Sequence, residues 1–226
     1  MRPRGAAIAL AVLIAAPELL FFLAELPFGL IFDQVANLRG QAVVSFGFWP
    51  GQVEIQVDDG SFGFLDMFAF VTYPFIHLSA VNAVFSILFV LVVHRFVLGL
   101  VQEVSCLAIF LGSSAFGALG YYFFAGTDFP LIGASPGYLG LFGVAAAIAV
   151  LIGRSAGDPS LNPIARTVLI LPALLIGFEI IASLLFGGRS RWVADLAGFS
   201  AGFLLAPLVL DIPYSRLVAK IMQLLK

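Results

Sequence analysis

Charged residues are scarce in this chain, and their scarcity excludes a soluble domain. Only 11% of the 226 residues are Asp, Glu, Lys or Arg, whereas 62% are hydrophobic, and the mean hydropathy is +1.10. A water-soluble fold of this size needs a polar outer face, which this composition cannot supply. We therefore expect lipid to surround most of the surface. The 23 glycines agree, because glycine is more frequent in membrane helices than in soluble ones.

Cysteine and histidine are almost absent as well. The single cysteine, Cys106, excludes a disulfide within the chain, so helix packing alone must hold the fold. With only His77 and His94 beside it, the sequence offers no cluster for a metal ion, and we expect no cofactor. A phosphate-binding glycine loop and a basic groove are also missing, which excludes nucleic acid as a partner.

Long apolar runs predict an all-α membrane protein with six transmembrane helices in a single domain, residues 1–226. Each span needs about 20 apolar residues. The predicted spans cover residues 6–32, 68–93, 99–124, 132–153, 164–186 and 192–210. The first run is too long for the apolar region of a signal peptide. Residues 33–66 are too polar to span but rich in aromatics, which predicts a long first outer loop lying in the membrane interface.

Basic residues predict the orientation of these spans. An even number of spans puts both termini on one side of the membrane. That side then carries Arg2, Arg4, Arg95, Arg154, Arg166, Arg216, Lys220 and Lys226. The other side carries only Arg39, Arg189 and Arg191. Because cytoplasmic loops are enriched in Lys and Arg, we expect both termini in the cytoplasm and the chain in a bacterial inner membrane.

The segment Gly133-Ala-Ser135-Pro-Gly137 has the spacing of a nucleophile elbow, with a membrane helix after it instead of a soluble one. Ser135 is predicted at the N-terminus of a helix that begins inside the membrane, where free N–H groups can stabilise an oxyanion. A small-residue packing site is the alternative interpretation, because glycines let neighbouring helices approach closely.

The predicted sixth span contains an acidic residue within an apolar stretch. It also carries small residues four apart, which form one close-packing face: Ala194, Gly198 and Gly202. Asp195 lies next to this face, and an ionisable residue at such a depth is a candidate functional residue because its burial in lipid is costly. The alternative is that Asp195 reaches the outer interface and pairs with Arg189 or Arg191.

Four further polar positions lie within predicted spans. Asn82 and Ser86 are four residues apart in the second span and share one helix face, where they line a site or cap the helix. Glu179 lies midway along the fifth span, and two interpretations stay open for it: contact with a client helix, or an interior hydrogen-bonded carboxylic acid. For Glu18 in the first span we expect a structural role.

These segments, in this order and spacing, resemble the rhomboid family of intramembrane serine proteases. The run Thr72-Tyr73-Pro-Phe75-Ile-His77 is similar to the family pattern Thr-Tyr-x-Phe-x-His. Gly133-Ala-Ser135, with Gly143 further along, resembles its nucleophile segment, and Glu103 after Gly99 also agrees. Ala194-Asp195-Leu-Ala-Gly198 resembles the family's Ala-His-x-x-Gly. The resemblance covers about residues 6–212 and implies a six-helix rhomboid-like bundle.

The chain departs from the family at the positions that carry catalysis. The resemblance makes Ser135 the nucleophile, but Asp195 occupies the place of the catalytic histidine. The oxyanion-stabilising His and Asn correspond to Asn82 and Ser86, and the residue after the serine is Pro136, which has no N–H to donate. Phe68 and Ala69 replace the family's Trp-Arg pair.

The altered positions leave three hypotheses open. The first is a pseudoprotease that lies in membrane lipid and binds transmembrane helices of client proteins. In another form of this hypothesis, the protein is an accessory subunit of a membrane complex. The second is an active protease in which Asp195 or, with difficulty, His77 is the base for Ser135. The third is a six-helix protein whose likeness is only architectural. In the fifth span, which resembles the family's lateral gate, Glu179 is a candidate client contact.

Overall fold

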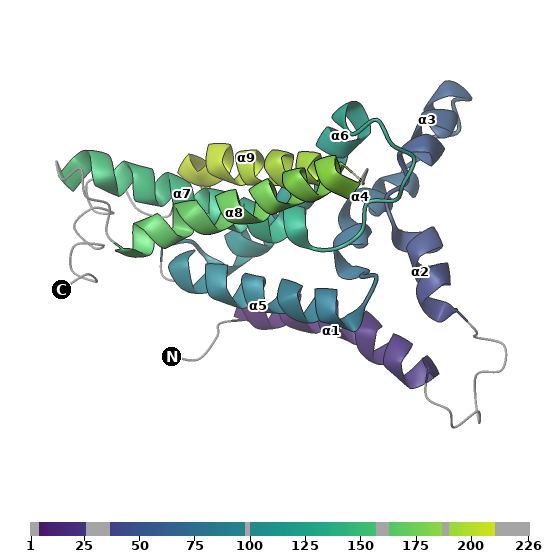
Figure 1. The fold of residues 1–226 in the computed structure, drawn as a ribbon, viewed down its shortest axis with the longest axis horizontal. Coiled ribbons are helices and arrows are strands. Elements are labelled where there is room, and N and C mark those ends of the chain that lie inside the picture. Colours follow the sequence, from purple (N-terminus) through teal and green to yellow (C-terminus); the bar gives the residue numbers. More distant parts are fainter. Residues whose placement is uncertain (1–4, 26–36, 98–99, 157–162, 187–189, 211–226) are drawn as a thin grey trace.

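The computed structural model of the chain describes residues 5–25, 37–97, 100–156, 163–186 and 190–210, and these residues are almost entirely helical (Figure 1). Five of the described helices are long and apolar enough to cross a membrane, and residues Ser135–Val150 add a shorter apolar helix. The predicted class, an all-α membrane protein, is confirmed. The end of the predicted first span, residues 26–32, and the basic tail lie outside the described residues.

The long helices run roughly along one axis, and the shorter ones gather where α1 ends and α5 begins (Figure 1). The described α-helices are α1 (Gly5–Glu25), α2 (Leu38–Phe46), α3 (Pro50–Asp58), α4 (Ala69–Thr72), α5 (Ala80–Val97), α6 (Glu103–Phe124), α7 (Ser135–Ala156), α8 (Pro163–Phe186) and α9 (Arg191–Val209). Two short 3-10 helices, η1 (Asp66–Phe68) and η2 (Tyr73–Phe75), flank α4.

Helix α7 lies at the centre of the bundle. Every side chain from residue 131 to residue 149 is buried, and α5, α6, α8 and α9 all pack against this helix. Glycine and alanine make up much of this stretch, so its surface is narrow and the surrounding helices approach it closely. The helix that begins with Ser135 is therefore shielded from lipid by its neighbours.

The closest packing joins α7 to α6 and α9 through glycines. A Cβ atom on Gly202 would collide with the backbone of Gly140, and one on Gly198 would lie 2.8 Å from the Cα atom of Pro136. On α6, a Cβ atom on Gly117 would lie 2.6 Å from the Cβ atom of Pro136. Such contacts favour association in lipid, where dispersion forces between helices replace the hydrophobic effect. The small-residue face predicted in the last span has this packing role.

The N-terminus of α1, the C-terminal turn of α5 and the N-terminus of α6 meet at one end of the bundle. The backbone N–H of Ala6 donates to Glu103 Oε2 at 2.7 Å, and His94 Nε2 lies 3.9 Å from Glu103 Oε1. Glu103 thus satisfies a donor of the first turn of α1 that has no partner within its own helix. His94 belongs to this end, whereas Ser135 lies at the opposite end of α7.

The second long helix begins later than the sequence predicts. We predicted a span from residue 68 to residue 93, but α5 runs from Ala80 to Val97. The short helical turns before it end at Ile76, whose backbone is extended with φ −103° and ψ 131°. The Ser79 hydroxyl accepts from the Asn82 N–H at 3.3 Å and caps the new helix instead. Residues 76–79 therefore lie between the helices, and His77 and Leu78 form part of the wall of a cavity.

The predicted outer loop contains two helices, α2 and α3, that its polar composition did not reveal. Asn37 caps α2 by accepting from the Gly40 N–H at 3.1 Å. Between α2 and α3, Phe48 exchanges two backbone hydrogen bonds with Leu131, at 3.1 and 2.8 Å, and both side chains are fully buried. This pairing holds the outer segment, which comprises α2 and α3, against the residues that immediately precede Ser135.

Candidate functional site

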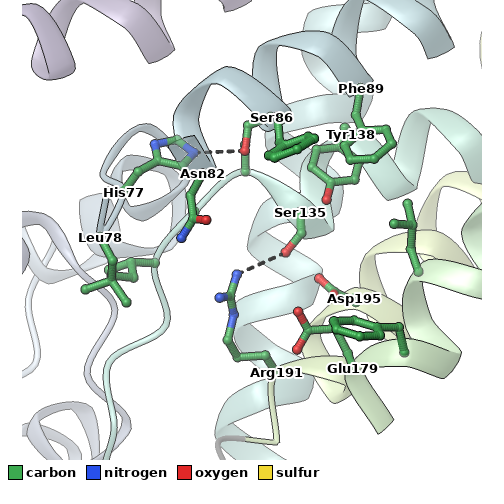
Figure 2. A pocket seen from close by; sticks show the side chains of 16 residues that line it. His77, Leu78, Asn82, Ser86, Phe89, Ser135, Tyr138, Glu179, Arg191 and Asp195 are labelled. Atoms are coloured by element: carbon green, nitrogen blue, oxygen red, sulfur yellow. Dashed lines mark hydrogen bonds between the residues drawn. The ribbon is translucent and has the colours of Figure 1, made fainter. Parts of the chain in front are cut away.

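A cavity of about 390 Å3 lies at the end of the bundle where α7 begins. Its lining includes the five residues singled out as catalytic, oxyanion or gate candidates: Asn82, Ser86, Ser135, Glu179 and Asp195. His77, Tyr138 and Arg191 add further polar groups, and Phe85, Phe89 and Phe178 add apolar surface. Figure 2 shows these side chains directed toward a common space between α5, α7, α8 and α9. The structure thus brings together residues more than 100 positions apart in the sequence.

Ser135 owes its position to the backbone before it. The Gly133 N–H donates to the Tyr73 carbonyl at 3.0 Å, and the Tyr73 hydroxyl donates to the Ser114 carbonyl on α6 at 2.8 Å. Gly133 has a φ of +96°, in the left-handed region that side chains with a Cβ rarely adopt. The turn therefore requires glycine, and Ser135 is the first residue of α7.

The prediction that Gly133 is a helix-packing residue is wrong, because this glycine precedes the helix and makes its turn. Gly137, in contrast, lies inside α7, where a Cβ atom would be 2.7 Å from both Phe110 and Ser114 on α6. Pro136 follows Ser135 in the first turn of α7, where a missing N–H is tolerated. Its ring faces Gly117 on α6, and its backbone faces Gly198 on α9.

Asp195 faces Ser135 from α9. Its side chain is only 3% exposed, and it forms a side-chain hydrogen bond with Ser135. Figure 2 shows both side chains at the cavity. Arg191 lies one turn earlier on α9, and its Nη2 donates to Ser135 Oγ at 3.5 Å. The charges of Arg191 and Glu179 both act on the Asp195 carboxylate. The alternative interpretation of Asp195, proximity to Arg191, is thus compatible with its position in the cavity.

His77 forms the opposite wall of the cavity and was not among the principal site candidates from sequence. Its Nε2 atom and the Ser86 hydroxyl form a hydrogen bond of 3.0 Å (Figure 2). The imidazole is 2% exposed, and burial is the main reason why its pKa is lowered to about 4. His77 is therefore neutral near pH 7 and engaged with Ser86. From sequence, the similarity of Thr72–His77 to a family pattern drew attention to this position, and His77 was considered only as a strained alternative base for Ser135.

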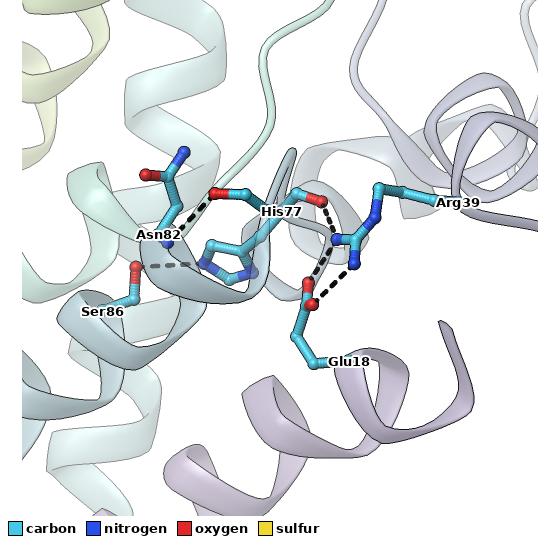
Figure 3. A network of polar contacts seen from close by, with 6 residues as sticks. Glu18, Arg39, His77, Asn82 and Ser86 are labelled. Carbon is cyan, nitrogen blue, oxygen red and sulfur yellow. Dashed lines mark hydrogen bonds and ion pairs between the residues drawn. The ribbon is translucent and has the colours of Figure 1, made fainter. Parts of the chain in front are cut away.

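An ion pair behind this wall connects the outer segment to the first long helix. Arg39 donates to both Glu18 carboxylate oxygens, at 2.8 and 3.0 Å, and to the His77 carbonyl at 2.9 Å (Figure 3). Its guanidinium also lies 4.7 Å from the centre of the Phe21 ring. The structural role expected for Glu18 is therefore explained: with Arg39 it fixes the segment that carries His77.

Glu179 reaches the cavity from α8, the most lipid-exposed of the long helices. Only 17% of the apolar window of α8 is buried, compared with 28% to 44% for the other four candidate spans. Both α8 and α5 pack against α7, and the cavity lies between them. A peripheral helix that carries an acidic group into the cavity is in the right place for contact with a membrane helix from outside.

Metal chemistry has no ligand set in the part of the chain that the structure describes. No three His, Cys, Asp or Glu side chains gather there closely enough to hold an ion. The polar groups of the cavity are thus three hydroxyls, two carboxylates, a guanidinium, an imidazole and an amide, from Ser86, Ser135, Tyr138, Glu179, Asp195, Arg191, His77 and Asn82.

Comparison with known proteins agrees with this geometry. The family model of the Rhomboid domain matches residues 65–212, which is more than half of the chain and includes all of the cavity-lining residues. No curated protein sequence matches the chain. The order of the segments, the bundle of apolar helices and the position of Ser135 opposite α9 are in accord with that match. The chain is therefore a member of the rhomboid family.

Proposed function

We propose that this protein is a rhomboid-like membrane protein that binds transmembrane helices of partner proteins and does not cleave them. The observation that carries this proposal is the absence of a histidine partner for Ser135 among the described residues. His77 bonds to Ser86, and His94 lies at the other end of the bundle beside Glu103. The sequence contains no third histidine.

The groups that do face Ser135 are poor substitutes for a histidine. A serine hydroxyl becomes a good nucleophile only when a neighbouring base takes its proton. An aspartate in water has a pKa of about 3.9 and is a weak base at neutral pH. Arg191 donates toward the same hydroxyl, and a cationic donor withdraws electron density from the oxygen. Loss of the base in serine proteases lowers the rate by several orders of magnitude.

The shape and lining of the cavity support helix binding. Aromatic side chains of α5 and α8 border it, and Phe85 and Phe178 are 52% and 70% exposed. Exposed apolar groups around a small polar centre suit a membrane helix that enters from the lipid. A fixed accessory subunit of a larger membrane complex would use the same surface, so a permanent partner is the second form of this proposal.

Active proteolysis is the competing function, and one observation favours it: Asp195 and Ser135 are in contact. A fluorophosphonate probe separates the two functions, because it labels only an activated serine. We expect no labelling of the purified protein in lipid nanodiscs and no cleavage of a single-span test helix. Ser200→Ala, on an exposed part of α9, is the control for background labelling. Labelling and cleavage that Ser135→Ala abolishes and Ser200→Ala does not would refute the proposal.

The variant Asp195→His tests how much of a catalytic site remains. If the base is the only missing group, this variant gains probe labelling at Ser135. We expect little or no gain, because Pro136 supplies no N–H and His77 and Asn82 are arranged along a wall held by Ser86 and Arg39.

The orientation in the membrane belongs to the same proposal. We infer cytoplasmic termini in a bacterial inner membrane, from the excess of basic residues on that side. The junction of Ala6 with Glu103 supports the inference, because it joins the starts of α1 and α6 at one end of the bundle. The cavity would then open near the outer face of the membrane.

A further inference from the structure

The cavity contains buried polar atoms that its own residues leave without partners. Asp195 Oδ1 and Arg191 Nε are each inaccessible, and neither has a hydrogen-bond partner among the described residues. Both side chains line the cavity (Figure 2). An unsatisfied buried carboxylate oxygen lowers stability, and a ligand that donates a hydrogen bond to it removes this penalty. The cavity is thus built to accept a polar group.

The charges around the cavity indicate the sign of that group. Among its described lining residues, Glu179 and Asp195 are acidic and Arg191 is the single cation. His77 contributes no charge near pH 7, because burial lowers its pKa to about 4. With both carboxylates ionised the lining carries a net charge of −1. Unbalanced charge at membrane depth is costly, and a cation that enters the cavity offsets it.

The location of Glu179 indicates the route of entry. Its helix, α8, packs against α7 and α9 and is exposed to lipid over most of its length. Phe178, next to Glu179, is 70% exposed and also lines the cavity. A group that arrives between α8 and α5 therefore meets aromatic surface first and the carboxylates behind it. This order, with aromatic surface outside and carboxylates behind it, fits a long side chain with a polar end that is attached to an apolar helix.

We propose that the cavity recognises a lysine or arginine side chain in the outer half of a partner's transmembrane helix, which pairs with Glu179 and Asp195. This inference rests on the proposed function and adds the chemical class of the partner. A basic side chain supplies several N–H donors on a long apolar stem, so it reaches Asp195 Oδ1 while its helix stays in lipid. An acidic side chain would meet two carboxylates and be repelled.

A binding experiment with matched test helices examines this inference. Three synthetic helices of about 20 Leu and Ala residues would differ at one position in the outer half, which is Lys, Leu or Glu. Binding to the full-length protein is measured by fluorescence energy transfer in phosphatidylcholine nanodiscs. We expect the Lys helix to bind at least about tenfold more tightly than the Leu helix and the Glu helix to bind most weakly.

Variants assign the preference to the cavity. We expect Glu179→Gln to remove most of the advantage of the Lys helix, and Glu179→Lys to reverse it in favour of the Glu helix. Glu54→Gln, on the exposed face of α3 and outside the cavity, should retain the wild-type preference. Asp195→Asn gives a second test of the same preference for the Lys helix. Of the two variants, Glu179→Gln should be better tolerated by the fold, because Glu179 lies on the peripheral helix α8.

The possible results of the binding experiment separate the inference about a basic side chain from the proposed function. Equal binding of the Lys and Leu helices, or a preference that Glu54→Gln removes as effectively as Glu179→Gln, overturns the inference and leaves helix binding intact. Loss of the Lys preference when phosphatidylethanolamine is added also overturns it, because a lipid ammonium group would then occupy the cavity. Cleavage of any test helix at a site that depends on Ser135 overturns the proposed function itself.

Discussion

At the scale of single residues, Arg39 connects two parts of the molecule that the sequence shows as unrelated. The outer segment contains one basic residue and the first span contains Glu18 within apolar residues, and the fold joins them as a two-oxygen ion pair. Because the two residues are 21 positions apart, the sequence did not indicate that they form an ion pair. An isolated acid in a predicted span was itself a signal, because such a group needs a partner.

Breaking this pair should destabilise the protein. We expect Arg39→Met to lower the free energy of unfolding by about 3 kcal/mol, because it leaves the largely buried Glu18 carboxylate without its cation. Cys106 is the only cysteine and is 1% exposed, so its reaction with a thiol-specific dye during heating reports unfolding. The double variant with Glu18→Gln should lose less than the sum of the single variants. Strict additivity would show that the pair contributes no coupling energy.

The buried imidazole of His77 should make stability depend on pH. Its pKa is about 4 in the folded protein and near ~6.5 in the unfolded chain. Between these values the unfolded chain binds more protons, so the free energy of unfolding decreases as pH falls from about 6.5 toward 4. Unfolding followed by the fluorescence of Trp49 and Trp192 measures this slope between pH 7.5 and pH 5. His77→Gln should flatten it, and an unchanged slope would contradict the assignment.

At the scale of helices, apolar runs and small-residue spacing predicted much of the bundle, and local chemistry determined where the elements begin. The predicted start at residue 68 was wrong because hydropathy does not register the extended backbone at Ile76 or the Ser79 cap. Helices α2 and α3 were missed for another reason: their composition is mixed, and tertiary contacts such as the pairing of Phe48 with Leu131 stabilise them. Ser135 and Asp195 were identified from sequence, and His77 and Arg191 were considered as possible partners for them, but only the fold shows Arg191 bonded to Ser135 and His77 bonded to Ser86.

The packing of α9 on α7 gives a prediction with an internal control. We expect Gly202→Ala to lower the free energy of unfolding by about 2 kcal/mol, because the added Cβ atom collides with the Gly140 backbone. At Gly177, in α8, nothing lies within 4 Å of the added atom, so Gly177→Ala should be neutral or slightly stabilising. The same dye reaction at Cys106 measures both variants. Equal effects of the two substitutions would argue against close packing at Gly202.

At the scale of the whole molecule, the polar groups divide between the two ends of the bundle. One end holds Glu103 with the start of α1, and the other holds the cavity with Ser135 and Asp195. From sequence, the basic residues predicted on which side of the membrane each loop lies, which stays a prediction. Sequence alone could not predict a cavity, because a cavity depends on how α5 and α8 pack on α7.

The inferred orientation can be measured with reporter fusions. A green fluorescent protein fused after Lys226 should fluoresce, because it folds in the cytoplasm and not after export. Alkaline phosphatase inserted after Asp59, which follows α3, should be active, because this enzyme requires the outer compartment. The reverse pair of results would place the cavity toward the cytoplasm and refute the inferred orientation.

The burial of α7 has a consequence for the order in which the protein is made. The ribosome completes α7 before it starts α9, yet α9 covers the glycine face of α7 and supplies Asp195 and Arg191. A nascent chain that stops before residue 191 therefore leaves the glycine face of α7 without its α9 cover and lacks two charged groups of the cavity, Arg191 and Asp195. Membrane insertion of α9 is therefore the step that covers the glycine face of α7 and brings Asp195 and Arg191 to Ser135.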